Sequence, residues 1–294
     1  MEASGDTSDR PVICFGEILW DFLPRGLFLG GAPFNVACHL AKLGRRPIFI
    51  SAVGEDVLGD EALRRASALG VDSGSVARRR ELPTGYVQVA LDRRGDASYT
   101  IIEPVAWDRI AVGERETARA ARASAVVFGS LAMRGEHNRR SLDSLLADCP
   151  GGKLMDVNLR PPYDDRERVL ALAAHADLVK LNEDELRILA DCPPATGLGQ
   201  AAARLSELVA RPRICVTRGA EGAFYCEDGA SVSAAAPAVE VVDSVGAGDA
   251  FMASLVDSLV AGEITTDSNQ WLARACAIGA KVASLDGATP DYTP

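Results

Sequence analysis

The sequence predicts an α/β protein with a doubly wound, mostly parallel sheet flanked by helices, and with a small antiparallel β lid. Two observations predict this class. Short apolar runs, typical of buried strands, alternate with longer segments of helical period. Residues 84–103 depart from that rhythm, because apolar and polar side chains alternate on either side of Arg93–Asp96, as in an antiparallel hairpin. We expect residues 1–294 to form one domain, with a lid contributed by about 17–29 and 84–103.

The strands of the main sheet are predicted from continuous apolar runs. Strands that are covered on both faces carry such runs, whereas a half-exposed strand alternates polar and apolar residues. The predicted strands are residues 11–16, 47–53, 124–129, 153–158, 177–182 and 213–219. Because these runs are continuous, they indicate a parallel sheet with helices on both faces.

The helices are predicted between these strands, from apolar side chains that recur at helical spacing. They span residues 33–43, 57–69, 136–147, 164–175, 183–191 and 197–210. Gly44 and Gly70 follow the first two helices, at the position where a glycine commonly ends a helix. The hairpin at 84–103 has two interpretations, a lid that closes over a ligand or a decoration of the sheet edge.

The charge of the chain argues against nucleic acid as a partner. The formal net charge is −10 and the isoelectric point is about 4.9, whereas phosphate backbones are bound by basic faces. The basic cluster Arg78–Arg80 is predicted to be a solvated turn. Residues 1–10 are polar and lack the apolar core of a signal peptide, so they are predicted to be a disordered tail. No apolar window reaches the length of a membrane span.

The cysteines indicate a reducing compartment. The chain has seven cysteines and three histidines, and no cysteine pair has the CxxC spacing of a structural zinc site. The cysteine density is also too low for a disulfide-stapled secreted domain. We therefore expect reduced, mostly buried thiols and a cytoplasmic location.

The stretch VVDSVGAGDAF, residues 241–251, carries the strongest chemical signal. The apolar residues after Asp249 recur at helical spacing, so a helix is predicted to begin at or near Gly246. The free N–H groups of a first helical turn bind anions, and Gly246 and Gly248 allow phosphate oxygens to approach the backbone. The turn is therefore predicted to bind a phosphoryl group.

Asp249 has two interpretations at this position. A carboxylate repels a bound phosphate, so its presence makes sense if it takes a proton from a hydroxyl that attacks the phosphorus. The alternative is an acidic residue that stabilises the N-terminus of the helix. The surrounding Gly-Ala-Gly turn favours the base.

Two other nucleotide motifs are excluded. The P-loop pattern GxxxxGK[ST] does not occur in the chain. GLGQAA, residues 197–202, matches GxGxxA but follows Cys-Pro-Pro-Ala-Thr instead of a strand, so it is predicted to be a helix start.

Two motifs resemble the signatures of a known family. DSVGAGDAF, residues 243–251, resembles the C-terminal signature D-[ST]-x-G-A-G-D of the ribokinase-like (PfkB) carbohydrate kinases. GGAPFNVACHLAKLG, residues 30–44, resembles their N-terminal signature in the GGAPxNVA form common in fructokinases. The resemblance extends from Pro11 to about Pro290. It implies the ribokinase-like fold and an ATP-dependent sugar kinase.

The resemblance implies roles for the C-terminal signature. Asp249 matches the catalytic base of the family, and the turn of Gly246, Ala247 and Gly248 matches the anion hole that stabilises the transferred phosphoryl group. Asp243 would support this turn. In relatives that bind a monovalent cation the matching residue belongs to the cation loop, so activation by K⁺ is left open.

On the sugar side the resemblance implies contacts to hydroxyl groups. GEILWDFLP, residues 16–24, resembles the opening strand of the family, with an aspartate just beyond it, and DVNLRPP, residues 156–162, resembles the DxNLR segment of fructokinases and 2-keto-3-deoxygluconate kinases. The implied sugar-binding residues are Asp21, Gly30, Gly31, Asn35 and Arg160. Alternatively, Asp21 is a polar lid residue, and Asn35 is a helix cap or a buried polar residue.

On the nucleotide side the resemblance implies three segments. KLNEDEL, residues 180–186, contains the N-x-x-E motif that organises Mg²⁺ and phosphates, often through water, although a helix N-cap explains Asn182 equally well. VTRGAEGA, residues 216–223, resembles the lining of the ATP groove, and DGATP, residues 286–290, resembles a terminal turn near adenine. The implied residues are Asn182, Glu185, Thr217, Gly219, Gly222 and Gly287.

The expected activity is transfer of the γ-phosphoryl group of ATP to a primary hydroxyl of a small sugar, with D-fructose as the expected acceptor and fructose 6-phosphate as the product. Alternatives are a 2-keto-3-deoxygluconate kinase, which shares the DxNLR segment, and after it a ribose or nucleoside kinase. From a different class comes a catalytically silent sugar-binding or scaffolding member of the fold. The expected partners are the sugar and ATP, together with a second copy of the chain if the edges of the lid pair.

Overall fold

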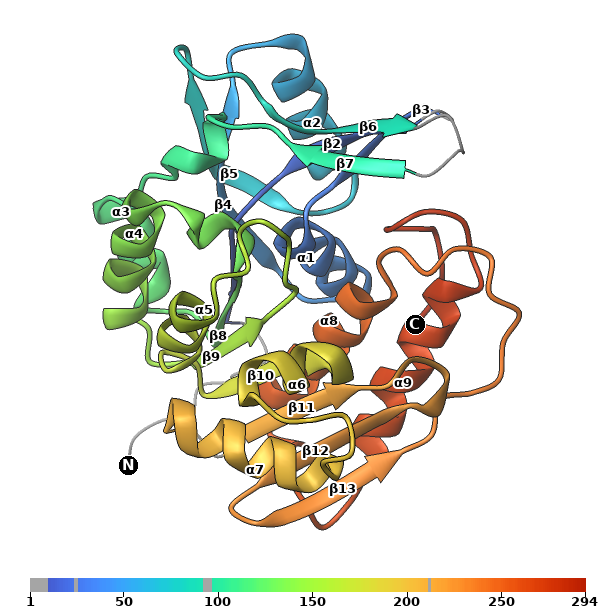
Figure 1. The fold of residues 1–294 in the computed structure, drawn as a ribbon. Helices are drawn as coiled ribbons and strands as arrows, with labels where there is room; N and C mark the ends of the chain where they lie inside the picture. The colour runs from blue at the N-terminus through green and yellow to red at the C-terminus, as the bar shows by residue number, and fades with distance from the viewer. Residues whose placement is uncertain (1–9, 24–25, 92–96, 211–212) are drawn as a thin grey trace.

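The computed structural model describes residues 10–23, 26–91, 97–210 and 213–294 (Figure 1). Nearly all of the predicted tail, and the predicted hairpin turn at Arg93–Asp96, lie outside these residues. Within them the largest element is a nine-stranded sheet with the order β13-β12-β11-β10-β9-β8-β1-β4-β5. Its strands are β1 (Val12–Phe15), β4 (Pro47–Gly54), β5 (Asp72–Arg79), β8 (Ala125–Gly129), β9 (Gly152–Asp156), β10 (Leu178–Asn182), β11 (Arg213–Thr217), β12 (Ala223–Glu227) and β13 (Ala230–Ala234).

The predicted strands form the parallel centre of this sheet. They correspond to β1, β4, β8, β9, β10 and β11, which pair only in parallel with one another. The strands that the sequence did not predict lie at the edges, where β12 and β13 form an antiparallel hairpin and β5 pairs with β4 alone. These edge strands are partly exposed and lack the continuous apolar run of a central strand.

The prediction of a solvated turn at Arg78–Arg80 is wrong for the first two residues. Arg78 and Arg79 are the last residues of β5 and pair with Val53 and Gly54 of β4. The Arg78 guanidinium donates to the carboxylate of Asp60, and that of Arg79 donates to a backbone carbonyl. An edge strand tolerates such charged residues, because one of its faces and its outer edge remain in water.

Helices cover both faces of the sheet (Figure 1). They are α1 (Ala32–Lys42), α2 (Val57–Ala68), α3 (Glu114–Ala120), α4 (Glu136–Ala147), α5 (Arg166–Ala173), α6 (Glu183–Ala190), α7 (Leu198–Val209), α8 (Ala247–Val260) and α9 (Gln270–Ala283). Side chains of α1, α2, α8 and α9 share one hydrophobic core, and those of α4, α5, α6 and α7 share the other. Strand β1 contributes Val12 and Cys14 to the first core, and Ile13 and Phe15 to the second. This alternation is the doubly wound arrangement that the sequence predicted.

The predicted ends of two helices are confirmed. Gly44 and Gly70 follow α1 and α2 with φ angles of 82° and 78°. After α1, the N–H of Gly44 donates to the carbonyl of Ala41 at 3.0 Å, and the N–H of Arg45 donates to that of Leu40 at 2.9 Å. These two bonds define a Schellman motif, which satisfies carbonyls at the end of the helix.

A second sheet of four strands, the lid sheet, lies over one end of the molecule (Figure 1). Its strands are β2 (Leu19–Leu23), β3 (Gly26–Gly30), β6 (Gly85–Leu91) and β7 (Ala97–Ile101). Strands β6 and β7 form the predicted antiparallel hairpin, β2 and β3 form another, and a parallel pairing of β2 with β6 joins the two hairpins. Because the lid sheet is separate from the main one, it is not a decoration of that sheet's edge.

The order of the main sheet reverses between β1 and β8. From β1 the chain proceeds to β4 and β5 on one side, and later to β8, β9, β10 and β11 on the other. In open α/β sheets, ligands bind beyond the carboxyl ends of the strands at such a switch point. A ligand site is therefore expected beside the residues that follow β1 and β8.

The cysteines are unpaired, as the sequence predicted. All seven are free thiols, and five of them are buried. Across the described ranges, no helix is both long enough and apolar enough to cross a membrane.

His39 of α1 holds the C-terminal segment against the main domain. Its Nδ1 lies 3.0 Å from the hydroxyl of Tyr292, and its Nε2 lies 3.0 Å from the carbonyl oxygen of Ala288. Burial lowers the pKa of His39 from its ordinary value of 6.5 to about 4. At pH 5 the unfolded chain therefore binds a proton that the folded chain does not bind.

Stability is accordingly expected to fall as the pH decreases from about 6.5 towards 4. Between pH 7 and pH 5 the contribution of His39 to the free energy of unfolding is expected to drop by about 2 kcal/mol. Urea unfolding of the native protein and of a His39→Gln variant, at both pH values, measures the difference between their pH dependences. Equal pH dependences would show that His39 does not titrate in this way.

Candidate active site

A polar cavity of about 340 Å³ lies at the carboxyl ends of the parallel strands. It is lined by the start of α1, the start of α8, the end of β9, Lys180 within β10, and the lid sheet. A larger, mainly apolar cavity of about 900 Å³ adjoins it, because both are lined by Asp21, Val87, Ile101, Arg160 and Val245. The switch point of the sheet, the lid and the GAG turn therefore meet at one site.

The glycine turn begins α8 as predicted. Gly246 is the N-cap residue, with a φ of 81°, and a Cβ atom at this position would overlap with the carbonyl oxygen of Ala288. Only glycine fits here, since both the backbone angle and the close contact exclude a side chain. Gly246, Gly248 and Asp249 all line the polar cavity, so the first turn of α8 faces it.

Asp249 lies in this first turn and contacts α1. The amide nitrogen Nδ2 of Asn35 donates a hydrogen bond of 2.8 Å to Oδ2 of Asp249. Burial, together with the negative charge of Asp156, raises the pKa of Asp249 to about 7, against the opposing effects of Asn35, Lys180 and Arg160. A carboxylate with a pKa near neutrality is suited to take and release protons.

A buried ion pair, which the sequence analysis did not single out, lies beside Asp249. The ammonium of Lys180 in β10 donates to both carboxylate oxygens of Asp156 at the end of β9, over 2.8 and 3.0 Å. The two residues are 7% and 4% exposed. Although burial disfavours the ammonium form, the charge of Asp156 raises the pKa of Lys180, so the lysine stays charged.

The ion pair places the positive charge of Lys180 next to the turn formed by Gly246, Ala247 and Gly248. A Cβ atom on Gly248 would lie 3.3 Å from Nζ of Lys180, and both charged residues line the polar cavity with Asp249. The available signal was a charge in the interior of each of two apolar strand segments, Asp156 in 153–158 and Lys180 in 177–182. Buried charges are rarely retained without a partner, so the two strands could have been matched on that ground.

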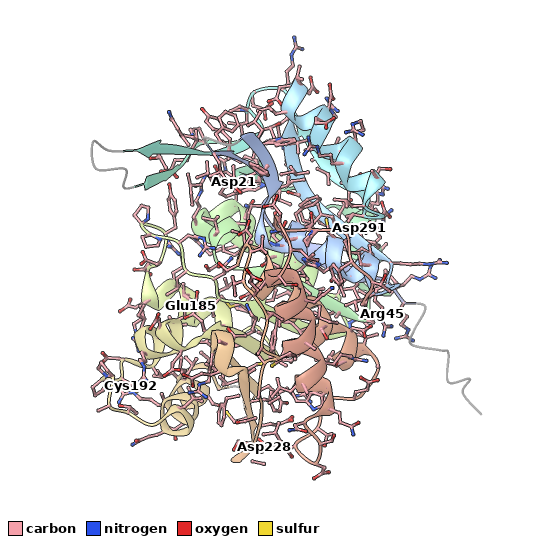
Figure 2. All side chains as sticks on the ribbon, turned by 90° about the vertical axis from the view of Figure 1, so that its right-hand side faces the viewer. Asp21, Arg45, Glu185, Cys192, Asp228 and Asp291 are labelled. Carbon is pink, nitrogen blue, oxygen red and sulfur yellow. The ribbon has the colours of Figure 1, made fainter. Side chains whose placement is uncertain are left out.

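The predicted sugar-side residues gather around the same cavity. Asp21, Gly31, Asn35 and Arg160 line it, and Gly30 precedes Gly31 at the end of β3. Asp21 lies within β2 of the lid sheet instead of just beyond the opening strand, which ends at Phe15 (Figure 2). Burial raises the pKa of Asp21 to about 6, and the charge of Arg160 opposes this shift.

The N-x-x-E motif forms a helix cap. Oδ1 of Asn182 accepts from the N–H of Glu185, and Oε2 of Glu185 accepts from the N–H of Asn182, over 2.8 and 2.9 Å. The N-cap interpretation of Asn182 is therefore confirmed. Oε1 of Glu185 accepts from the N–H of Leu159 at 2.7 Å, so this buried carboxylate also holds the segment that carries Arg160.

Thr217, Gly219 and Gly222 line neither of the two cavities, and the same is true of Asn182 and Glu185. Thr217 pairs with Asn182 at the carboxyl ends of β11 and β10, and Gly219 and Gly222 lie at the two ends of the short helical turn that follows Arg218. Figure 2 shows Glu185 in the main domain, apart from Asp21 on the lid. This group therefore occupies the same edge of the sheet as the cavity, beyond β10.

Asp243 and Gly287 form a separate contact. Oδ1 of Asp243 accepts from the N–H of Val245 at 3.0 Å, and its Oδ2 accepts from that of Gly287 at 3.4 Å. Both residues line the larger cavity. Asp243 thus supports the loop before α8, in agreement with its predicted role in the turn.

The segment GLGQAA is the start of α7, as predicted, with Gly197 as N-cap.

Comparisons with known proteins agree with this architecture. A family model described as pfkB family carbohydrate kinase matches residues 25–293. The fructokinase of Escherichia coli is 30% identical over 292 residues, which cover 93% of this chain and 93% of that protein. The crystal structure of the Xylella fastidiosa fructokinase with bound ATP has a TM-score of 0.83 at 25% identity, over 96% of this chain and 94% of that one. The fructokinase of Vibrio cholerae O395, solved in a form that binds fructose, ADP and a calcium ion, shares the fold, with a TM-score of 0.80 at 24% identity over 96% of this chain and 95% of that one.

Proposed function

Because this chain belongs to the PfkB family of carbohydrate kinases and is an ATP-dependent sugar kinase, we propose that it phosphorylates a primary hydroxyl of D-fructose, forming fructose 6-phosphate. The observation that carries the proposal is the half-buried Asp249, whose carboxyl group has a raised pKa and lies in one polar cavity with the first turn of α8. The similarity to the fructokinase of Escherichia coli supports fructose as the acceptor.

In the proposed reaction Asp249 is the general base. The hydroxyl of the sugar gives its proton to the Asp249 carboxylate, and its oxygen bonds to the γ-phosphorus of ATP. The bond from this phosphorus to the bridging oxygen of ADP breaks, and ADP leaves with the electron pair. A hydrogen bond from Asn35 orients the carboxylate before the reaction.

The start of α8 would stabilise the charge of the transferred group. The N–H groups of its first turn, at Gly246, Ala247 and Gly248, form the proposed anion hole. The buried Lys180 ammonium, close to Gly248, adds a positive charge. On the open side of the cavity, Asp21, Gly30, Gly31 and Arg160 would hold the sugar, while the lid sheet limits access of water.

The nucleotide would bind beyond β10 and β11. It would lie along Asn182, Glu185, Thr217, Gly219 and Gly222, with Gly287 near the adenine ring. Among the described residues no cluster of three or more His, Cys, Asp or Glu side chains could hold a metal ion. Mg²⁺ would be held mostly by phosphates of ATP and by water, with Glu185 contacting a water ligand. When bound with ATP, Mg²⁺ neutralises phosphate charge. Asp243 would belong to a loop that binds K⁺.

A second acceptor is favoured by Arg160. This exposed arginine lines both cavities, and its guanidinium could pair with the carboxylate of 2-keto-3-deoxygluconate. The catalytically silent alternative is disfavoured, since the base and the glycine turn are both present and face one cavity.

An assay of ADP release tests the proposal. Fructose, 2-keto-3-deoxygluconate, ribose and adenosine are compared as acceptors, with an Asp249→Asn variant as control, and with Mg²⁺, K⁺ or both in the buffer. We expect turnover with fructose, and ³¹P NMR of the product should show the phosphate on a primary carbon. If no acceptor exceeds the control, the kinase mechanism is wrong; if only the keto acid is turned over, the acceptor alone is wrong.

The free thiols and the lid suggest the cellular setting and the assembly. Free, mostly buried cysteines are typical of a reducing compartment, so we propose a cytoplasmic location. Strands β3 and β7 are the outer strands of the lid sheet, and edge strands expose unpaired backbone groups. A homodimer through the lid is the corresponding assembly.

A further inference from the structure

Glu17 is a buried carboxyl group that neither the motifs nor the proposed mechanism uses. It is 3% exposed and follows β1 at the switch point of the sheet. Its carboxyl group accepts hydrogen bonds from its own N–H and from that of Ala32, the first residue of α1. Because the N-cap residue Gly31 has no side chain, Glu17 provides a cap for α1. This capping role accounts for one of the two oxygens of the Glu17 carboxyl group.

The second oxygen of this carboxyl group is left unexplained. Oε2 of Glu17 is buried and has no hydrogen-bond partner among the described residues. The same is true of Oδ1 of Asn35, whose orientation follows from the bond that its Nδ2 donates to Asp249. Buried polar atoms without partners are rare in native proteins, and each requires an explanation.

Both atoms belong to residues of the polar cavity that Asp249 also lines. Asn35 contacts Asp249 directly, so its partnerless oxygen lies within one side chain of the proposed base. A hydroxyl group can donate a hydrogen bond to an amide oxygen or to a carboxylate. A polyhydroxylated ligand therefore satisfies both atoms, by donating from one hydroxyl to the Glu17 carboxylate and from another to the amide oxygen of Asn35.

We propose that Glu17 is a substrate-binding residue, whose Oε2 pairs with one hydroxyl of the acceptor sugar while Oδ1 of Asn35 pairs with another. This inference rests on the proposed function. It makes Glu17 a determinant of specificity, since an analogue without the matching hydroxyl leaves a buried oxygen unpaired. Sites built in this way discriminate strongly against the analogue that lacks the group.

A Glu17→Gln variant tests this role, because glutamine keeps an oxygen that can cap α1 and replaces the other oxygen by an amide nitrogen. Binding of fructose, and of fructose analogues that each lack one hydroxyl, is measured by calorimetry on the native enzyme and on the variant. We expect the substitution to weaken fructose binding about 10- to 100-fold, with the KM for ATP unchanged. The analogue that lacks the hydroxyl bound by Glu17 is expected to bind the native enzyme more weakly than fructose does, by a similar factor. The Glu17→Gln variant should bind this analogue almost as well as the native enzyme binds it, because the contact is already missing.

Asp165→Asn is the matched control for capping. The Asp165 carboxylate caps α5 by accepting from the N–H of Arg168 at 2.8 Å, and Asp165 lines neither cavity. This variant should leave sugar binding unchanged. Thermal unfolding of both variants establishes that they are folded.

The proposal is overturned if Glu17→Gln binds fructose as the native enzyme does, or if its loss of affinity is the same for every analogue. Either result would reduce Glu17 to a cap of α1. Failure of the proposed function has a different signature, namely the absence of sugar-dependent ADP release by the native enzyme.

Discussion

Replacement of Asp249 by asparagine is expected to lower kcat by about 10²- to 10⁴-fold, the usual contribution of a general base. Asparagine has nearly the same shape and can still accept the hydrogen bond from Asn35, so the variant is expected to fold and to bind sugar. The KM for the sugar should therefore change much less than kcat. Steady-state kinetics of ADP release, with sugar affinity measured separately by calorimetry, separate these two effects.

The pH dependence of the rate provides an independent readout of the same group. The base is active when it is ionised, and burial raises its pKa to about 7. The kcat/KM of the native enzyme is expected to fall about tenfold per pH unit below that value, and to level off above it. The residual activity of Asp249→Asn should lack this limb. A variant that keeps both the native rate and the native pH profile would exclude Asp249 as the base.

Replacement of Gly246 by alanine is expected to lower kcat by about 10²- to 10³-fold, comparable to the loss of an oxyanion-hole donor. The added methyl group would overlap with the carbonyl oxygen of Ala288, and the φ of 81° disfavours any side chain. The turn must therefore shift, and its N–H groups no longer point to the transferred phosphoryl group. Kinetics with saturating sugar and ATP measure this loss.

Gly262→Ala is the matched control, at the other end of α8. Gly262 also has a positive φ, of 71°, but a Cβ atom there would meet nothing within 4 Å. We expect this variant to lose about 1 kcal/mol of stability and to keep its kcat. If both variants lost activity equally, backbone strain in α8 would explain the effect, and the anion hole would not.

The local patterns of the sequence were sufficient for the centre of the fold. Hydrophobic runs predicted the parallel strands, because a strand covered on both faces can be recognised from its own residues. The ends of helices were also predictable, since Gly44, Gly70 and Gly246 adopt positive φ angles that other residues avoid. The edge strand β5 and the hairpin of β12 and β13 escaped prediction, because a half-exposed strand carries a weaker signal.

The motifs of the sequence located the candidate site, whereas tertiary structure decided which groups act together in it. Asn35 and Asp249 are 214 positions apart, and their hydrogen bond exists only because α1 and α8 pack on the same face of the sheet. The pairing of Lys180 with Asp156 depends in the same way on β9 and β10 being neighbours. A sequence shows which residues carry charge and which helices begin with glycine. Burial, and with it the raised pKa of Asp249 and the partnerless oxygen of Glu17, arises only when distant segments exclude water from the same cavity.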